Sequence, residues 1–387
     1  MKKVGLAVCY DTKNFGSQLQ VLATVKKVED LGCEAEIIRY KKKLTPQFVR
    51  QTLPRLFNIS FVASKLRSKV QAKKMAKYPA YVKLIKVRNT RFSQFVKTHF
   101  DCLSPVYAGW ETLVKETRKN YDMFLCGSDQ LWLPNNLGSH FYTLEFAPDD
   151  KKKVSYATSF GVSCIPSFQK KRTARYLQRF DALSTRELAG AKIIRELTGI
   201  AAKVVCDPTM LLTPEDWAEV ICEKKLIEKP YVFCYFLGSN TEHRLAAERL
   251  KQELGLELVS CPFLDSFAEC DLTFADEKLF DVDAADFVNL IRNAEYVLTD
   301  SFHGTVFSIL HQKKFLTFNR FGNEANSRNS RIDSLCELLK LQERRYDGSV
   351  EKLFDEIDYE MVGRELDALR EASICYLRDA LELVKES

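Results

Sequence analysis

One histidine stands in a polar turn between an apolar strand and an amphipathic segment. Residues 294–298 favour a strand, and residues 305–310 continue as a helical pattern. The turn between them ends in Asp300-Ser301-Phe302-His303-Gly304. In an open α/β sheet, ligands bind beyond the carboxyl ends of the strands, and an imidazole there can exchange a proton near neutral pH. Among the five histidines of the chain, His303 is therefore our candidate for a catalytic residue.

Alternating strand and helix patterns place this histidine in a two-domain α/β chain. At 387 residues the chain exceeds what one hydrophobic core usually covers. A strand at 4–8, a helical repeat at 19–28 and a strand at 35–39 form a βαβ opening, which predicts a parallel sheet. The alternation restarts at 231–237, after a junction near 207–217. We predict an N-terminal domain, a C-terminal domain and a last helix that could return to the first domain, covering residues 1–210, 211–360 and 361–387.

Composition favours a cytoplasmic protein. Hydrophobic residues make up 46% and charged residues 28% of the chain, as in soluble globular proteins. The first residues contain too short an apolar run for a signal peptide, and no later run reaches the length of a membrane span. The twelve cysteines are scattered without a C-x-x-C pair, which is typical of buried thiols in a reducing compartment. We therefore expect neither a zinc site nor a disulfide framework.

Residues 41–100 form a basic insert whose charge differs from that of the rest of the chain. Residues 41–100 contain sixteen Lys or Arg and no Asp or Glu, although the net charge of the chain is only +6. In one interpretation these side chains are the solvated faces of helices. In the other, the insert docks peripherally on an anionic membrane or a diphosphate-linked lipid, since each basic residue near such a surface contributes about 1 kcal/mol. Nucleic acid is disfavoured, because no familiar binding motif accompanies the charge.

Small polar turns follow several of the predicted strands. They contain Asn14-Phe15-Gly16-Ser17, Gly127-Ser128-Asp129-Gln130, Ser159-Phe160-Gly161 and the turn of His303. Glycine and serine let backbone N–H groups approach a ligand, and a helix N-terminus favours an anion. Together the turns favour a phosphorylated ligand. Neither a G-x-G-x-x-G after a strand nor a G-x-x-x-x-G-K-[ST] occurs, which disfavours dinucleotide and P-loop sites.

These turns and two further blocks resemble those of the polysaccharide pyruvyl transferase family. The further blocks are Ser184-Thr185-Arg186-Glu187 and Asp207-Pro208-Thr209, and the match runs in order over roughly residues 5–340. The resemblance implies two Rossmann-like domains in a GT-B-like arrangement with an interdomain cleft. It also implies that pyruvate is transferred from phosphoenolpyruvate to two hydroxyls of a sugar, which gives a cyclic ketal and phosphate without a metal or a cofactor.

The resemblance assigns roles to individual residues of the donor side. The family's active-site histidine corresponds to His303, which we expect to act as a general acid. Better-understood members have an arginine two residues earlier, where this chain has Ser301. The charge that binds phosphoenolpyruvate must therefore come from elsewhere. Our candidates for the phosphoenolpyruvate site are Ser301, Gly304, Arg186, Arg320, Arg328 and Arg331.

On the acceptor side, the polar turns of the first domain supply the candidates. The predicted set for the sugar is Asn14, Gly16, Ser17, Ser128, Asp129, Gln130 and Ser159. Asp129 could instead cap a helix, and Trp132 could either stack on a sugar or pack in the core. The sugar would be carried by a lipid diphosphate at the inner face of the cytoplasmic membrane.

Two rival functions remain open at this point. A GT-B-like glycosyltransferase would use the same cleft for a nucleotide sugar, although the acidic ribose-binding element common in such enzymes is not apparent. A non-catalytic glycan-assembly protein would keep the fold without the chemistry, and Ser301 in place of an arginine keeps that alternative open.

Overall fold

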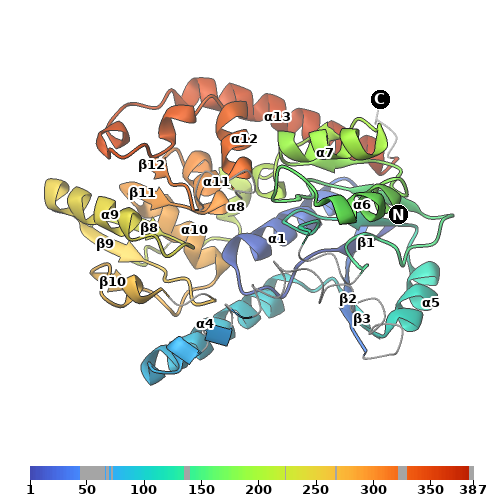
Figure 1. Ribbon diagram of the computed structural model, residues 1–387, viewed down its shortest axis with the longest axis horizontal. Coiled ribbons are helices and arrows are strands. Elements are labelled where there is room, and N and C mark those ends of the chain that lie inside the picture. Colours follow the sequence, from blue (N-terminus) through green and yellow to red (C-terminus); the bar gives the residue numbers. More distant parts are fainter. Residues whose placement is uncertain are drawn as a thin grey trace.

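The first half of the chain folds into an α/β lobe around a parallel sheet (Figure 1). The computed structural model describes residues 1–43, 66, 69–70, 73–134, 140–222, 224–265, 268–320 and 329–382. The strands, in the spatial order β3-β2-β1-β4-β5, are β1 (Lys3–Ala7), β2 (Glu34–Lys41), β3 (Leu103–Ala108), β4 (Met123–Cys126) and β5 (Lys152–Ser155). β4 is buried throughout, which explains its continuous apolar sequence.

Helices cover this sheet, and a small second sheet extends the lobe. The helices are α1 (Phe15–Asp30), α4 (Pro79–His99), α5 (Trp110–Asn120), α6 (Lys170–Leu177) and α7 (Leu188–Thr198). The small sheet pairs β6 (Ser184–Thr185) with β7 (Lys203–Val204), and the 3₁₀ turn η3 (Pro208–Met210) follows it. α1 begins after Asn14, whose side chain accepts a hydrogen bond from the N–H of Ser17. The βαβ opening predicted from the sequence is confirmed.

The second lobe repeats the strand order of the first. Its strands, in the spatial order β10-β9-β8-β11-β12, are β8 (Tyr231–Tyr235), β9 (Glu257–Ser260), β10 (Glu277–Lys278), β11 (Tyr296–Thr299) and β12 (Lys314–Thr317). Its helices are α8 (Pro214–Ala218), α9 (Thr241–Leu254), α10 (Ala284–Asn293), α11 (Phe302–Leu310), α12 (Ser330–Leu338) and α13 (Tyr359–Ala380). All its strand pairs are parallel, so the predicted α/β class with two Rossmann-like domains is confirmed.

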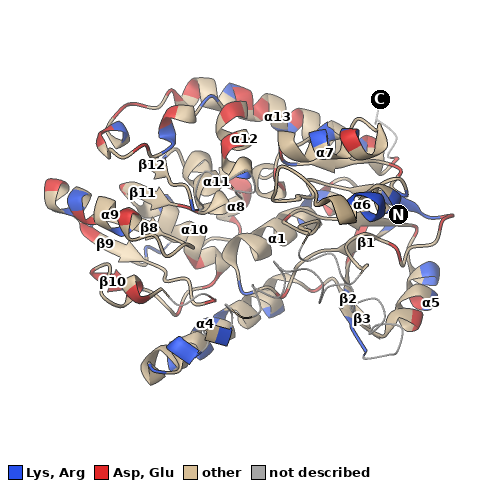
Figure 2. Ribbon diagram, viewed as in Figure 1, with Lys and Arg blue, Asp and Glu red and all other residues tan. Residues whose placement is uncertain are grey.

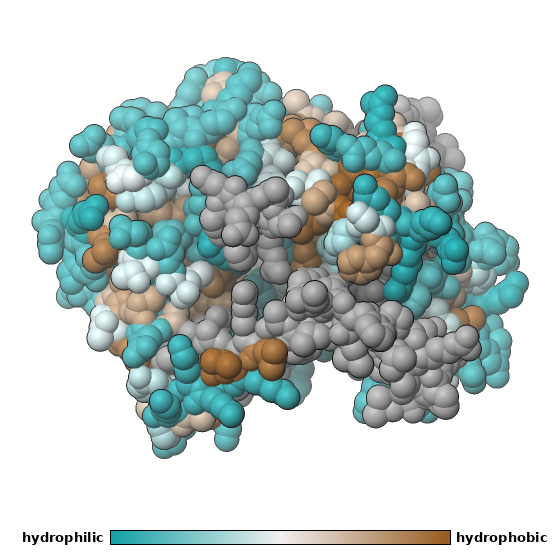
Figure 3. All heavy atoms as spheres, in the orientation of Figure 1, coloured by the Kyte–Doolittle hydropathy of each residue, from teal (hydrophilic) through white to brown (hydrophobic). Residues whose placement is uncertain are grey.

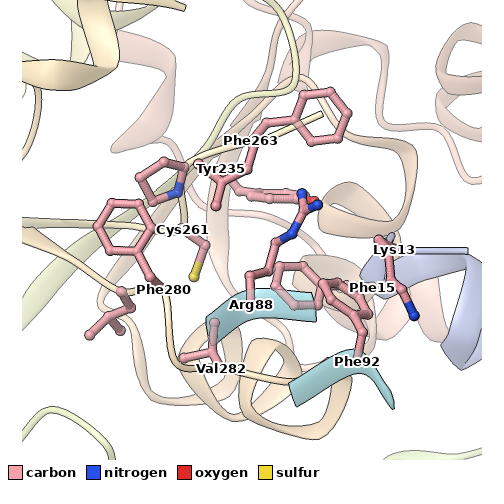
Figure 4. A pocket seen from close by; sticks show the side chains of 12 residues that line it. Lys13, Phe15, Arg88, Phe92, Tyr235, Cys261, Phe263, Phe280 and Val282 are labelled. Atoms are coloured by element: carbon pink, nitrogen blue, oxygen red, sulfur yellow. The ribbon is translucent and has the colours of Figure 1, made fainter. Parts of the chain in front are cut away.

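Aromatic side chains join the two lobes. Phe15, the first residue of α1, stacks on Phe92 of α4 and on Phe287 of α10, with both pairs of ring centroids 4.9 Å apart. Tyr235, at the end of β8, lies 4.8 Å from the Phe287 ring. Figure 4 shows Phe15, Phe92 and Tyr235 around a small recess, with Arg88 of α4 among them. The hydrophobic core is therefore continuous from one lobe to the other.

α13 contacts both lobes. Near its start, the Tyr359 hydroxyl donates to the carbonyl of Lys313, beside β12 (2.5 Å). Near its end, the Tyr376 hydroxyl donates to the carbonyl of Ser155 in β5 (2.9 Å), and the Ser373 hydroxyl accepts from the N–H of Cys206 (2.9 Å). The last helix therefore runs from the second lobe back to the first. The exact domain boundaries stay a prediction.

Sequence reasoning missed one edge strand of each five-stranded sheet, β3 and β10. β3 contains Pro105, which has no N–H to donate, and the sequence pattern there does not alternate. An edge strand tolerates proline because one of its sides has no neighbouring strand. β10 is only two residues long and is also an edge strand. Of the basic insert, residues 44–65, 67–68 and 71–72 lie outside the described residues.

Candidate active site

His303 lies where the two lobes meet. It is the second residue of α11 in the second lobe, and its side chain is 8% exposed. Its Nε2 atom is 3.5 Å from Oδ1 of Asp207, in the first lobe. On the other side of the ring is Gly16 of α1, so close that a Cβ atom there would lie 1.9 Å from Nδ1. The imidazole is thus held between a carboxylate and the first turn of a helix.

Asp207 is held in place by four hydrogen bonds. Oδ1 accepts from the N–H and the hydroxyl of Thr209 (3.1 and 2.8 Å). Oδ2 accepts from Nη1 of Arg186 (2.6 Å) and from the hydroxyl of Ser128 (2.9 Å). Burial alone would raise the pKa of Asp207, but the charges of His303 and Arg186 hold it well below its usual value. Asp207 is therefore an ionised carboxylate directed at the imidazole.

Arg186 is the charge centre of the first lobe. Its side chain is 1% exposed, and its guanidinium contacts the carboxylates of Asp207, Asp129 (3.5 Å) and Glu187 (4.0 Å). Burial would lower the pKa of Arg186, but these carboxylates raise it. The guanidinium also lies over the ring of Phe302, 4.6 Å from its centroid. Arg186 is consequently a fully compensated cation that links the turn after β6 to α11.

Arg331 is a second buried cation, with a different environment. It lies on α12 and is 9% exposed, and its guanidinium is 5.8 Å from the same Phe302 ring. The Gln130 amide, with its oxygen turned to Arg331, accepts from Nη2 (2.9 Å) and Nε (3.2 Å). Among the described residues, no carboxylate lies within 4 Å of this guanidinium. Burial and the charge of Arg186 lower the pKa of Arg331 to about 9, so it remains a cation at neutral pH.

Asp129 connects these groups to α1. Its backbone has a φ of 80°, a left-handed conformation that is costly for a residue with a side chain and is common at functional sites. Its Oδ2 accepts from the hydroxyl of Ser17 (2.6 Å), and its Oδ1 accepts from the N–H of Gln130 (2.7 Å). Burial opposes ionisation, yet the charges of Arg186 and His303 lower the pKa of Asp129. Its carboxylate is 21% exposed, so it can still reach a ligand.

The structure thus brings together half of the fourteen residues that the sequence suggested. Gly16, Ser17, Asp129, Gln130, Arg186, Arg331 and His303 form one contiguous group. Arg320 lies beside it, where its guanidinium donates to the carbonyl of Asp300 (3.0 Å). Arg328 lies outside the described residues.

Several other candidates are engaged in contacts within the protein. The Ser159 hydroxyl donates to Glu187 (2.8 Å), as the Ser128 hydroxyl does to Asp207. The Ser301 hydroxyl accepts from the N–H of Gly304 (3.3 Å) and caps α11. Gly304 itself is packed against Thr299, since a Cβ would lie 2.5 Å from the Thr299 hydroxyl.

Sequence reasoning left three functional neighbours out of the site. The carboxylate of Asp207 lies against the imidazole of His303. The carboxylate of Glu187 accepts from the N–H groups of residues 160 and 161. The ring of Phe302 contacts the guanidinium groups of Arg186 and Arg331. Asp207 and Glu187 stood in recognisable blocks, directly after short strands. Their position at strand ends was the signal that could have identified them.

Comparison with solved structures identifies the class of fold. A structure of S. aureus MnaA with UDP matches with a TM-score of 0.52 and 12% identity, covering 100% of this chain and 99% of that one. A putative UDP-N-acetylglucosamine 2-epimerase from Listeria monocytogenes matches at 0.49 and 11%, covering 100% and 98%. At such low sequence identity, a match shows only that the fold is shared. The chain is a GT-B-like protein of two Rossmann-like domains, as the sequence predicted.

Comparison with family models identifies the family. The polysaccharide pyruvyl transferase model matches residues 14–320, and this chain belongs to that family. Membership supports a transferase of polysaccharide biosynthesis. A search of curated protein sequences finds no match. In the part of the chain that the structure describes, no group of three or more His, Cys, Asp or Glu side chains is arranged to hold a metal ion.

The contact between Gly16 and His303 predicts that alanine substitutions at two helical glycines, Gly16 and Gly363, change the free energy of unfolding differently. Gly16→Ala must displace the imidazole or α1, and we expect it to lower the free energy of unfolding by about 1–3 kcal/mol. Gly363→Ala in α13 meets open space and should be neutral or stabilising by up to about 1 kcal/mol, since alanine favours a helix. Urea unfolding of both variants checks this, and equal effects would contradict the contact.

The two arginines predict opposite effects on stability. Arg186→Gln leaves Asp207 and its neighbouring carboxylates without their cation, and we expect a loss of about 3–5 kcal/mol. Arg331→Gln removes a buried cation that pairs with no carboxylate in the described part of the chain, so the melting temperature should stay the same or rise. Thermal unfolding in ligand-free buffer measures both. A loss for Arg331→Gln as large as that for Arg186→Gln would show that Arg331 is compensated in the free protein.

Proposed function

We propose that this protein is a pyruvyl transferase that uses phosphoenolpyruvate to form a cyclic ketal on a sugar of a bacterial surface polysaccharide precursor, with release of phosphate. The observation that carries the proposal is Arg331, a buried cation that has no carboxylate within 4 Å among the described residues and lies against Phe302 together with Arg186. Such a cation favours a small, strongly anionic ligand at this position. Membership in the family provides the reaction type.

In the proposed reaction, His303 is the general acid. One sugar hydroxyl adds through its oxygen to C2 of phosphoenolpyruvate, while a proton from the imidazole reaches C3 and completes a methyl group. A second hydroxyl of the sugar then displaces phosphate from C2 and closes the ketal ring. One of the two hydroxyl protons returns to His303 and replaces the proton given to C3. The other leaves with phosphate. A positioned acid contributes about 10²–10⁴-fold to such a step.

The donor would lie between the arginines and the start of α11. Arg331 takes the place of the arginine that other members carry where this chain has Ser301. Ser301 and Gly304 serve the donor indirectly in this proposal, because they shape the first turn of α11. Arg320 is held by Asp300 nearby, and Arg328 completes the candidate set. Phe302 keeps the guanidinium planes of Arg186 and Arg331 facing the same region.

The acceptor sugar would lie on the first lobe. Asp129 is the main candidate to receive a sugar hydroxyl, because its carboxylate is partly exposed and its backbone is strained. Ser17 and Gln130 flank it. Asn14, Ser128 and Ser159 would act indirectly, by holding α1, Asp207 and Glu187. We further propose that the sugar is linked to a lipid diphosphate at the cytoplasmic face of a membrane.

Asp207 would be a positioning residue for the acid. Its carboxylate does not reach solvent, and it lies 3.5 Å from Nε2 of His303. The charge of His303 is among the causes that lower the pKa of Asp207, so the carboxylate that faces the imidazole is ionised. This arrangement supports a histidine that begins the reaction as an acid.

Ligand-induced stabilisation tests the donor. Phosphoenolpyruvate at about 100 times its dissociation constant should add about 2.7 kcal/mol to the free energy of unfolding. Arg331→Gln should lose most of this stabilisation. UDP-sugars and other nucleotide sugars should give none. Stabilisation by a nucleotide sugar instead would replace the proposal by the glycosyltransferase alternative, and phosphoenolpyruvate binding without turnover on any acceptor would favour a non-catalytic protein.

The pH dependence of turnover tests the acid and its positioning residue. Activity that requires a protonated imidazole falls as the pH rises. Asp207→Asn removes the negative charge that favours this form, so the alkaline limb of the pH–rate profile should move to lower pH. His303→Ala should remove the limb and lower turnover by at least about 10²-fold. An Asp207→Asn enzyme with reduced activity and an unmoved limb would assign Asp207 a purely structural role.

A further inference from the structure

α4 has one face that is held by the second lobe. Tyr81, Arg88, Phe92 and Phe95 are its buried residues. Arg88 pairs with Asp265 (2.7 Å), beyond β9 in the second lobe. Arg91 contacts the carboxylates of three aspartates that precede or begin α10, namely Asp281 (3.4 Å), Asp283 (3.1 Å) and Asp286 (2.7 Å). These ion pairs fix the orientation of the helix.

The opposite face of α4 is a basic stripe. Val82, Lys83, Lys86 and Val87 are exposed and recur at the spacing of one helical face, and Lys97 continues them. The two valines are each 38% exposed. α4 contains no Asp or Glu, and among the described residues no carboxylate lies within 4 Å of these three lysines. The name "basic stripe" is used below for Val82, Lys83, Lys86, Val87 and Lys97.

The long exposed helices α9 and α13 do not share this pattern, whereas the short helix α6 also contains basic residues and no acidic ones. Figure 2 shows acidic and basic residues mixed along α9 and α13, whereas α4 is only basic. In Figure 3, apolar side chains appear among hydrophilic ones at the lower edge, over α4. A solvated helix face usually intersperses both signs of charge. Lysines around exposed aliphatic side chains are typical of a helix that lies on a membrane surface.

The basic stripe is also connected to the candidate active site through one layer of side chains. Phe92, on the buried face of α4, stacks on Phe15, and its carbonyl accepts from the side chain of Gln18. Gly16, next to Phe15, is the residue that contacts His303. A surface bound to the basic stripe would therefore lie against α4, whose opposite face packs on the start of α1, the helix that adjoins the site.

We propose that the basic stripe docks the protein on an anionic lipid bilayer and thereby brings the site to its lipid-linked sugar. The inference rests on the proposed function for the identity of the acceptor, while docking itself depends only on this surface. Each lysine near an anionic surface strengthens binding by about fivefold, and the interaction weakens with salt. No helix in the described part of the chain is both long and apolar enough to cross a membrane.

Co-sedimentation of the full chain with lipid vesicles tests docking. The wild type should bind vesicles of phosphatidylcholine and phosphatidylglycerol at low salt and should not bind vesicles of phosphatidylcholine alone. K83E/K86E should lower binding to the anionic vesicles by at least about 25-fold. V82S/V87S should lower it by a smaller factor, because the apolar contribution alone is removed.

The chain offers a matched control. Lys192 and Arg195 are exposed at the same i, i+3 spacing on α7, which lies at the opposite edge of the molecule in Figure 1. K192E/R195E changes the net charge by the same amount, so it should retain vesicle binding. If both double variants lost vesicle binding equally, the net charge of the protein would explain binding, and the proposal would be overturned.

A second readout separates this proposal from the proposed function. K83E/K86E should keep the thermal stabilisation by phosphoenolpyruvate, since its substitutions lie outside the site. If vesicle binding stays intact in K83E/K86E, the basic stripe is not the docking surface, whatever the donor. Loss of acceptor turnover with intact vesicle binding would assign the basic stripe to a protein partner and would equally overturn docking on lipid.

Discussion

The arrangement of the first lobe depends on one buried cation. Arg186 is almost completely removed from solvent, and a guanidinium in that position is tolerated only if carboxylates compensate it. The compensating groups come from turns that follow different strands, namely Asp129 after β4, Glu187 after β6 and Asp207 after β7. β4 belongs to the five-stranded sheet and β6 and β7 to the small sheet, and a parallel bridge between Val154 and Ala182 places the two sheets side by side, so that these side chains converge. The second oxygens of these carboxylates then position α1, His303 and residues 159–161.

Arg186 and Arg331 are two buried cations that differ in how their charges are compensated within the protein. Both guanidinium groups lie over the same phenylalanine ring, yet only Arg186 has described carboxylates within 4 Å. Arg331 donates to the amide oxygen of Gln130, and burial and the charge of Arg186 lower its pKa more than the more distant Asp129 and Glu187 raise it. A protein without need of an anion would gain stability by replacing such a residue. That it stands at the junction of the lobes supports a site which is completed by its ligand.

Sequence reasoning reached the elements of the fold and the turn of His303, because these depend on local periodicity and on strand ends. It could not rank Arg320 and Arg331, since their distances to the turn depend on how α12 and the residues directly after β12 pack in the folded chain. Nor could it separate hydroxyls that face a ligand from those that hold the protein together. Ser128 and Ser159 look like ligand-binding serines in sequence and are internal donors in the structure. Asp207 was recognised as part of a family block, but its role depends on a contact between lobes.

The course of α13 has a consequence for the order in which the chain can fold. A helix of 22 residues spans about 33 Å, enough to bridge from β12 to β5. Until this helix has been synthesised, the N–H of Cys206 lacks the hydroxyl of Ser373, and the carbonyl of Ser155 accepts from Ser184 but not from Tyr376. The first lobe is synthesised before the second, but its hydrogen bonds with α13, at Ser155 and Cys206, can form only after the second lobe has been synthesised.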